Sequence, residues 1–284
     1  MASIKNRFNQ EIKDKRVLVC AHCGTFGGGI IENTLAAFNL ALAMGADIVE
    51  MDVIRSKDGE FYVFHDTEES RLLGFMNNIH SLEAKEIENL TYLNQYGFRT
   101  KQKIEKLETI LLALRNRCLI NLDRCYSRGE DFFLSVIELV YDLQMQDQII
   151  FKAPPKPEIL AMLKKLDKEI LFLPIITNSN QVDLCETSGI DILGFELVFN
   201  QKNSPLIAEE NFRAWKKKGY VLWGNTLSID YTYPLAAGYD DELALTSSLD
   251  LAWGQLYDLG FSIIQSDWVY FIKKYLKTRM NKEE

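Results

Sequence analysis

The heptapeptide DIVEMDV, residues 47–53, predicts a buried β-strand. Side chains along a strand alternate between two faces, so Ile48, Glu50 and Asp52 share one face, and the apolar residues between them share the other. In a closed barrel, one face packs against surrounding helices and the other lines the interior. Because the apolar face belongs against helices, we expect Glu50 and Asp52 to point inward, near the carboxyl end of the strand.

Similar segments alternate with helical patterns along the chain. Eight barrel strands are expected, at residues 17–21, 47–53, 118–123, 148–152, 170–175, 191–197, 220–223 and 261–265. Helices are expected after Asn33-Thr34 up to Gly45, and at residues 107–115, 131–143, 157–166 and 209–218. This alternation predicts an α/β fold, a (β/α)8 TIM barrel.

The connection after the second barrel strand is unusually long. A short strand at 61–64 is expected to return after the Lys57-Asp58-Gly59 turn. The residues that follow exceed a normal strand–helix connection and predict a small insertion, approximately residues 66–106. We expect one domain spanning residues 1–284, because no linker or low-complexity stretch divides it.

The composition excludes several classes of protein. The 284 residues are 47% hydrophobic and carry a formal net charge of −8, which argues against nucleic acid as a partner. The longest apolar stretches have only strand length, so no integral membrane segment is expected. Residues 1–16 lack the apolar core of a secretory signal, and the five cysteines suit reduced thiols, so we expect a cytoplasmic protein. Nothing in the sequence indicates an oligomeric state.

A third carboxylate comes from a later strand. By the same alternation, Asp123 faces inward at the carboxyl end of the segment 118–123. Together with Glu50 and Asp52 it would form an acidic cluster whose pKa values rise unless a cation joins it. An all-oxygen ligand set favours Mg2+ or Ca2+. We therefore interpret Glu50, Asp52 and Asp123 as ligands of one divalent cation.

Two of the three histidines follow strands that end near this cluster. His22 follows the segment 17–21 and His65 follows 61–64, and barrel enzymes place catalytic groups at such strand ends. Imidazoles exchange protons near neutral pH. We interpret His22 and His65 as catalytic, since two proton-transfer groups beside a metal are what phosphodiester cleavage requires. His80 falls in the insertion and receives no role.

Further motifs accompany these residues along nearly the whole chain. In order they are His22-Cys23-Gly24, Glu32-Asn33-Thr34, Gly45-Ala46-Asp47, Glu50-x-Asp52-Val53, Asp58-Gly59, His65-Asp66, Arg71, Leu107-Glu108-Thr109, Trp223-x-Asn225, Gly260 and Ile264-Gln265-Ser266-Asp267. The series, within residues 17–276, resembles the glycerophosphodiester phosphodiesterase family.

The resemblance carries expectations about activity. It implies a TIM barrel with a small insertion and a metal-dependent phosphoric diester hydrolase of lipid metabolism. The substrate would be a small-molecule glycerophosphodiester, cleaved to glycerol phosphate and an alcohol. His22 and His65 would act as general base and general acid around a phosphate bound to one divalent metal, with Glu50, Asp52 and Asp123 as its ligands.

Two positions depart from the family's pattern. The family usually has Arg directly after the first histidine, where this chain has Cys23, and Lys two residues after the third carboxylate, where it has Cys125. Arg124 and Lys152 are the available substitutes as substrate-binding cations. A charge-assisted contact to phosphate is worth about 1.5–3 kcal/mol, or one to two decades in rate.

Glu196 and Trp223 are further candidates for substrate binding. Glu196 follows Gly194-Phe195 in a predicted strand and would reach the rim if it faces inward. Trp223 could form a wall for the substrate, and a core aromatic is its alternative role. The acidic run Asp240-Asp241-Glu242 is expected to be a solvated loop rather than a second cation site.

Other functions stay open on the sequence alone. The reaction could stop at a cyclic phosphate, as in related lyases, or the chain could bind a phosphodiester without cleaving it. Lys152 could instead form a Schiff base with a carbonyl substrate. Cys20-Ala21-His22-Cys23 could bind a soft metal, although structural zinc needs four nitrogen or sulfur ligands and no second cysteine pair has that spacing.

Overall fold

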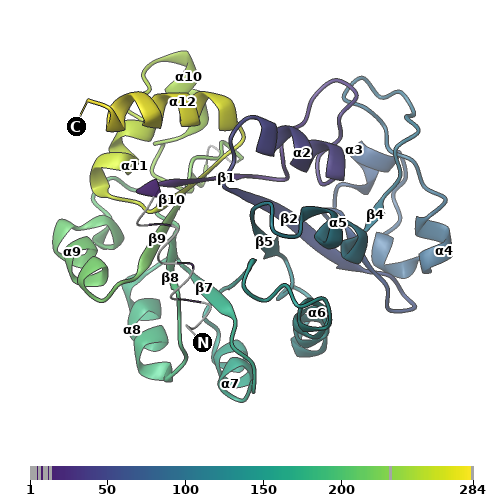
Figure 1. The fold of residues 1–284 in the computed structure, drawn as a ribbon, viewed down its shortest axis with the longest axis horizontal. Helices are drawn as coiled ribbons and strands as arrows, with labels where there is room; N and C mark the ends of the chain where they lie inside the picture. Colours follow the sequence, from purple (N-terminus) through teal and green to yellow (C-terminus); the bar gives the residue numbers. More distant parts are fainter. Residues whose placement is uncertain (1–4, 6–7, 9–11, 13–14, 230–231, 283–284) are drawn as a thin grey trace.

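The chain forms a closed barrel of eight parallel strands surrounded by helices (Figure 1). The computed structural model describes residues 5, 8, 12, 15–229 and 232–282. The barrel strands are β1 (Leu18–Ala21), β2 (Ile48–Arg55), β5 (Leu119–Asp123), β6 (Ile149–Ala153), β7 (Leu171–Ile176), β8 (Gly194–Leu197), β9 (Val221–Asn225) and β10 (Ile263–Ser266). Because β1 pairs with both β2 and β10, the ring closes, and the predicted TIM barrel is confirmed.

Helices connect the strands and cover the outside of the barrel. They are α2 (Leu35–Ala43), α5 (Leu107–Leu114), α6 (Glu130–Asp142), α7 (Pro157–Lys164), α8 (Ser179–Ser188), α9 (Glu209–Lys217), α10 (Asp241–Thr246), α11 (Trp253–Leu259) and α12 (Val269–Met280), with a 3-10 turn η2 (Pro205–Ile207). The Thr34 hydroxyl accepts a hydrogen bond from Ala37 N–H and caps α2, as its sequence predicts. Within the described residues, no helix has the length and apolarity needed to cross a membrane.

The alternation of β2 is as predicted. Val49, Met51 and Val53 belong to the apolar layer between the barrel and the helices. Ile48 lies in a separate cluster of inward-facing residues, which also includes Leu119 at the start of β5. Side chains of opposite parity on one strand therefore enter different layers, and this places Glu50 and Asp52 on the interior face.

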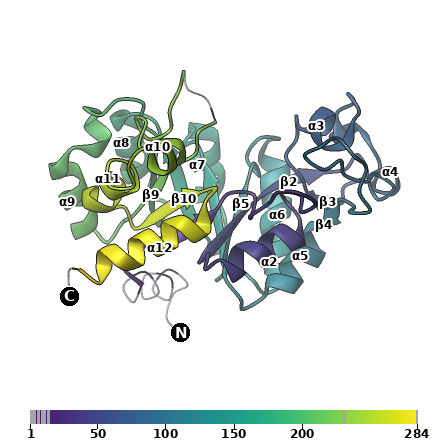
Figure 2. The same ribbon diagram turned by 90° about the horizontal axis from the view of Figure 1, so that it is seen from above.

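The segment between β2 and α5 forms a small structure beside the barrel (Figure 2). β2 continues past the barrel and pairs antiparallel with β3 (Phe61–Val63), which pairs with β4 (Glu105–Lys106). Between these strands lie α3 (Glu69–Leu73), η1 (Ile79–Ser81) and α4 (Ala84–Ile87). Tyr62, Phe64 and Tyr92 anchor an apolar cluster separate from the main core. This core explains how a segment of short elements is held in place next to the site.

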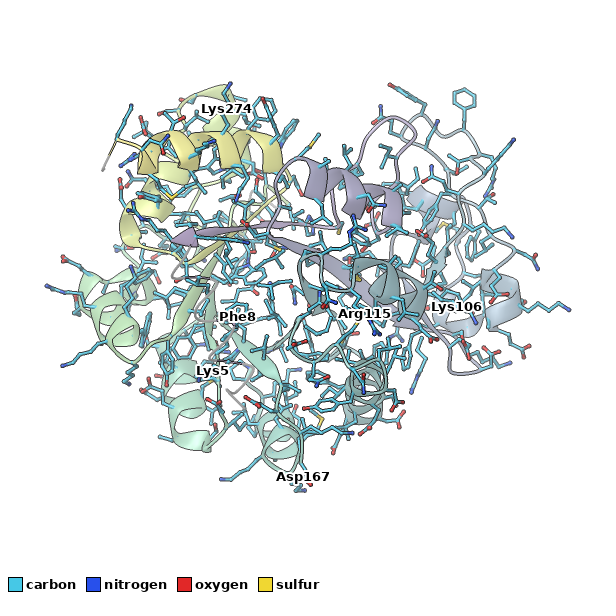
Figure 3. The ribbon with its side chains drawn as sticks, in the orientation of Figure 1. Lys5, Phe8, Lys106, Arg115, Asp167 and Lys274 are labelled. Carbon is cyan, nitrogen blue, oxygen red and sulfur yellow. The ribbon has the colours of Figure 1, made fainter. Side chains whose placement is uncertain are left out.

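The amino-terminal end of the barrel is covered by Phe8. Its side chain is only 2% exposed and packs in the interior cluster with Leu18 and Ile48, the first residues of β1 and β2. Figure 3 shows Phe8 near the centre of the barrel and Lys5 close by. The Lys5 ammonium donates to Asp191 and to the carbonyl of Ile192. The interior is thus filled at this end, and the carboxyl ends of the strands are left for chemistry.

Strand β8 begins at Gly194, three residues later than the sequence suggests. A Cβ at Gly194 would lie 1.9 Å from the carbonyl oxygen of Val221 on β9. We expect Gly194→Ala to separate β8 from β9 and to lower Tm by more than about 5 °C. Overpacking typically costs about 1–3 kcal/mol, and a clash with backbone atoms cannot be relieved by rotating a side chain. Thermal unfolding followed by circular dichroism measures this. Gly29→Ala, where an added Cβ meets nothing within 4 Å, is the control; equal Tm values for both variants would contradict the prediction.

Candidate active site

Three carboxylates meet at the carboxyl ends of β2 and β5. Asp52 and Asp123 are register partners on these adjacent strands, and Glu50 lies two residues before Asp52 on the same face. Glu50 is 1% and Asp52 3% exposed. Burial and the charge of Asp52 raise the pKa of Glu50 to about 8, and burial also raises the pKa of Asp52. The cluster predicted from the sequence therefore forms, at the rim where it was expected.

The loop after β1 holds two of these carboxylates. The backbone N–H of Cys23 donates to Glu50 Oε2 at 2.8 Å. The Asn33 amide donates to Asp52 Oδ2 at 2.9 Å and accepts from the Asp52 N–H at 3.1 Å. Cys23 and Asn33 both have left-handed backbones, with φ of 50° and 56°, which turn the loop back over β2. From the sequence, Asn33 was part of a helix cap and of one resemblance motif, and the structure adds its two hydrogen bonds with Asp52.

This donor set fits a hard divalent cation. Burial, together with repulsion between the carboxylates, raises the pKa values of Glu50 and Asp52, and the hydrogen bonds that these two acids accept from Cys23 and Asn33 come from neutral groups. Carboxylate oxygens from two strands are the ligands that Mg2+ and Ca2+ prefer. Glu50, Asp52 and Asp123 are thus the residues that would hold such an ion.

His22 follows β1 and is oriented by Asp267, which follows β10. The two side chains approach to 2.9 Å between Nδ1 and Oδ1. Burial by itself lowers the pKa of His22, but the hydrogen bond to Asp267 and the negative charge of Glu50 outweigh it and raise the pKa to about 9. With Nδ1 turned to Asp267, Nε2 is left for substrate. Asp267 ends one of the resemblance motifs but received no role from the sequence, and the pairing of β1 with β10 brings it to His22.

A buried aspartate supports this pair from behind. Asp241 is 3% exposed and accepts hydrogen bonds from the Ser266 hydroxyl, the Trp253 indole and the Asp267 backbone N–H. The expectation that Asp240-Asp241-Glu242 is a solvated loop is therefore wrong for Asp241. The run begins helix α10, whose start packs under the end of β10, and a carboxylate there satisfies donors that would otherwise be unpaired.

His65 approaches the carboxylates from β3. Burial raises the pKa of Asp52, and a positive charge on His65 would oppose that rise. Nδ1 lies 2.6 Å from the carbonyl oxygen of Asp66, so Nδ1–H donates and Nε2 is the free nitrogen of the neutral ring. His80 lies in the insertion, where Nδ1 contacts the carbonyl of Arg55 at 3.0 Å. The structure thus brings His22 and His65 to the acids and leaves His80 outside.

The two substitute cations are already engaged by carboxylates. Arg124 has a left-handed backbone and its Nε lies 2.7 Å from Asp66. Lys152 is 1% exposed, and its Nζ lies 2.9 Å from Glu196 and 3.5 Å from the centroid of the Trp223 ring. Their role in substrate binding stays a prediction, because either cation must exchange a carboxylate for a phosphate.

Glu196, Trp223 and Lys152 belong to one buried polar network inside the barrel. Gln265 accepts hydrogen bonds from Lys152 Nζ at 3.2 Å and from the Trp223 indole at 3.1 Å. The Asn225 amide donates to Glu196 at 2.6 Å. Glu196 faces inward, an orientation that the sequence left open. The ion pair with Glu196 and the hydrogen bond to Gln265 give Lys152 a structural role in this network.

The surface next to His22 is open and apolar. A hollow of about 460 Å3 is lined by Asp267 together with Phe26, Leu40, Trp268 and Phe271 among others. Phe26, Trp268 and Phe271 are all more than 40% exposed. The site is therefore polar at the strand ends and bordered by aromatic side chains beyond the His22–Asp267 pair.

Carboxylates and histidines gathered at the strand ends of a TIM barrel place the protein in the class of barrel enzymes with acid–base groups at that rim. Residues 22–188, more than half of the chain, match the sequence profile of the glycerophosphoryl diester phosphodiesterase family. The chain belongs to this family. Residues 172–276 match a second profile, described as a domain of unknown function (DUF4996).

Two curated relatives show the extent of the sequence similarity. A glycerophosphodiester phosphodiesterase of Caldanaerobacter subterraneus is 37% identical over 82 residues, which are 29% of this chain and 33% of the relative. The mouse lysophospholipase D GDPD1 is 26% identical over 185 residues, which are 64% of this chain and 53% of the relative. The chain thus spans between a third and about half of the length of these proteins.

Solved structures share the fold over nearly the whole chain. A glycerophosphoryl diester phosphodiesterase from Parabacteroides distasonis superposes with a TM-score of 0.76 at 19% identity, covering 98% of this chain and 93% of its own. An Oleispira antarctica phosphodiesterase, solved in complex with the product sn-glycerol-3-phosphate, has a TM-score of 0.67 at 22% identity and covers 94% and 99%. At these identities the likeness establishes the fold.

Proposed function

We propose that the protein hydrolyses glycerophosphodiesters to glycerol phosphate and an alcohol. One observation carries the proposal: Glu50, Asp52 and Asp123 lie on the adjacent barrel strands β2 and β5, and His22 and His65 follow β1 and β3, which both pair with β2. Family membership supports it, and the Oleispira antarctica phosphodiesterase holds sn-glycerol-3-phosphate on the same fold.

The three carboxylates would hold one divalent cation, Mg2+ or Ca2+. Bound there, it would supply charge stabilisation to the phosphate and lower the pKa of a neighbouring substrate hydroxyl. Hydrogen bonds hold two of the acids in place. Glu50 accepts one from the Cys23 N–H and Asp52 accepts one from the Asn33 amide, so both carboxylates are positioned before substrate binds.

The histidines would move the protons. His22 Nε2 takes the proton of the substrate hydroxyl beside phosphorus, and the resulting alkoxide attacks. His65 Nε2 donates its proton to the departing alcohol, which requires its ring to be protonated at the start. Water then opens the cyclic phosphate with the roles reversed. Asp267 keeps the His22 ring turned and stabilises the imidazolium that forms.

Hydrolysis of glycerophosphodiesters with and without EDTA tests the proposal. We expect turnover with Mg2+ or Ca2+ and loss of turnover on chelation. Phosphorus NMR of the product separates glycerol phosphate from a cyclic phosphate, the alternative outcome. A rate unaffected by chelation would refute the metal-dependent mechanism.

A non-catalytic binding protein is the second candidate. This function is favoured because Arg124 and Lys152 form ion pairs with carboxylates. Neither of these cations is then free to take the place of the two phosphate-binding side chains that the family usually has. Calorimetric binding of glycerol phosphate without any product formation from a diester would support this function over hydrolysis.

The Asp267–His22 contact predicts a change in pH dependence. In Asp267→Asn, the pKa of His22 falls, because a negative charge and a charge-assisted hydrogen bond are lost. A general base must be unprotonated to act, so the acidic limb of the pH–rate profile is expected to move to lower pH, and kcat to fall about ten- to hundredfold through misorientation of the ring. An unchanged acidic limb would show that Asp267 does not set the state of His22.

A further inference from the structure

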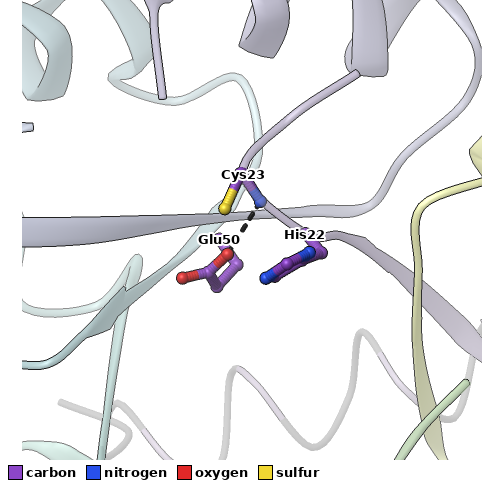
Figure 4. Close-up of side chains that lie close together, drawn as sticks. All are labelled: His22, Cys23 and Glu50. Carbon is purple, nitrogen blue, oxygen red and sulfur yellow. Dashed lines mark hydrogen bonds between the residues drawn. The ribbon is translucent and has the colours of Figure 1, made fainter. Parts of the chain in front are cut away.

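We propose that His22, Cys23 and Glu50 form a binding site for a thiophilic divalent cation of the zinc type. One ligand atom from each of the three side chains lies within 4.8 Å of the others. Figure 4 shows the three side chains gathered on one side of the loop after β1, with the His22 ring directed toward Glu50. The grouping combines a nitrogen, a sulfur and an oxygen donor, unlike the all-oxygen set of Glu50, Asp52 and Asp123.

The donor chemistry selects the ion. Thiolate and imidazole prefer zinc to magnesium or calcium, which take oxygen ligands. Zinc bonds of about 2.3 Å to sulfur and 2.0–2.2 Å to nitrogen and oxygen put tetrahedral ligand atoms about 3.5 Å apart. The three ligand atoms, now within 4.8 Å of one another, must move closer to reach that spacing. The His22 side chain is 25% exposed, so an ion can enter from its side, whereas Cys23 is 4% exposed.

Neighbouring carboxylates complete the arrangement. His22 turns Nδ1 to Asp267 and offers Nε2, and a carboxylate behind a histidine is the usual outer partner of a metal-bound imidazole. The Cys23 thiol lies 3.5 Å from Asp52 Oδ2, so a fourth oxygen ligand stands next to the sulfur. Cys20, the other cysteine of the motif, packs among interior residues such as Leu18 and Ile48 and is not part of the site. The structure thus pairs Cys23 with an acid from β2 and not with a second cysteine.

Binding exchanges protons for the ion. The S–H bond of Cys23 breaks, a sulfur–zinc bond forms, and the proton leaves to solvent. A proton held by His22 Nε2 or by the Glu50 carboxyl is released in the same way, as the nitrogen lone pair and a carboxylate oxygen bind the ion. A second consequence rests on the proposed function. Zinc bound here occupies His22 Nε2, the proposed base, and Glu50, one of the three carboxylates proposed to hold Mg2+ or Ca2+, so zinc inhibits hydrolysis. An arginine at position 23 would exclude the ion, and the site is therefore specific to the cysteine of this chain.

Cobalt chloride titrated into the metal-free protein tests the site directly. We expect a near-ultraviolet thiolate-to-cobalt charge-transfer band that saturates at one ion per chain and disappears when zinc displaces cobalt. Cys23→Ser should lose the band. Cys118→Ser, which removes a thiol at the opposite end of the barrel just before β5, should keep it. A wild-type protein without the band, or a band that persists in Cys23→Ser, overturns the proposal.

Inhibition by zinc supplies an independent arm. The half-inhibitory zinc concentration in excess magnesium is expected to rise at least about tenfold in Cys23→Ser, given that losing even an outer partner costs 10–100-fold in affinity. Circular dichroism confirms that the variant is folded. A cobalt band in a protein without turnover would contradict the proposed hydrolase function and support the zinc site. Turnover in a protein without the band would support the hydrolase function and contradict the zinc site.

Discussion

His65→Ala is expected to lower kcat for glycerophosphodiesters by about two to four decades. A positioned general acid contributes about 10²–10⁴ to a rate, and alanine leaves no group to protonate the departing alcohol. The effect should be smallest for substrates whose leaving group needs no proton. Steady-state rates with an alkyl and a nitrophenyl leaving group measure this, and we expect the nitrophenyl diester to lose far less.

The third histidine supplies the matched control. His80→Gln changes an imidazole on the same insertion that contacts Arg55 and Asp66 and lies outside the carboxylate cluster. It should retain most of the activity and the same leaving-group dependence. If His65→Ala keeps full activity on the alkyl substrate, His65 is not the acid. Equal losses on both substrates would indicate a positional role.

Glu50→Gln is expected to abolish metal-dependent turnover while stabilising the metal-free protein above neutral pH. Loss of a ligand removes several kcal/mol of charge stabilisation in the transition state, at least about a thousandfold in rate. The stability effect has the opposite sign. Glutamine keeps the shape and an oxygen acceptor for the Cys23 N–H but removes a buried charge beside Asp52.

The sign of the pH effect follows from the raised pKa. The folded wild-type protein holds a proton on Glu50 up to about pH 8, whereas the unfolded chain releases it near the ordinary value of 4.5. The contribution of Glu50 to the free energy of unfolding is therefore greatest below pH 4.5 and falls as pH rises to about 8, by about 1.4 kcal/mol per pKa unit. His22, raised from 6.5 to about 9, adds a slope of the same sign.

Thermal unfolding in EDTA at pH 5 and pH 8 measures this dependence. We expect similar Tm values for wild type and Glu50→Gln at pH 5, and a higher Tm for the variant at pH 8. Saturating Mg2+ should raise the wild-type Tm and leave the variant's nearly unchanged. Glu138→Gln, which neutralises an exposed acid on α6, should follow the wild type. A variant less stable than wild type at pH 8 would mean that Glu50 is not under electrostatic strain.

The local pattern of apolar and polar residues was sufficient to predict the barrel fold and the inward orientation of the acidic side chains. The two-residue repeat in β2 assigned Glu50 and Asp52 to the interior, and the structure places them there because the apolar residues between them pack against helices. The same reasoning located Asp123. His22 and His65 were recognisable because each follows a predicted strand. His22 follows the barrel strand β1, where barrel enzymes place catalytic groups, whereas His65 follows β3, which pairs antiparallel with β2 outside the ring.

Only the tertiary structure decided which groups act on these residues. Asp267 reaches His22 because the last strand closes on the first, and Asp241 reaches Asp267 from a helix that the sequence suggested was a solvated loop. Neither contact can be predicted from the local sequence, since each joins segments that are far apart in the chain. The left-handed turn at Cys23 likewise exists because the loop folds back onto Glu50, and this closure turns a cysteine that looked like half of a pair toward a carboxylate.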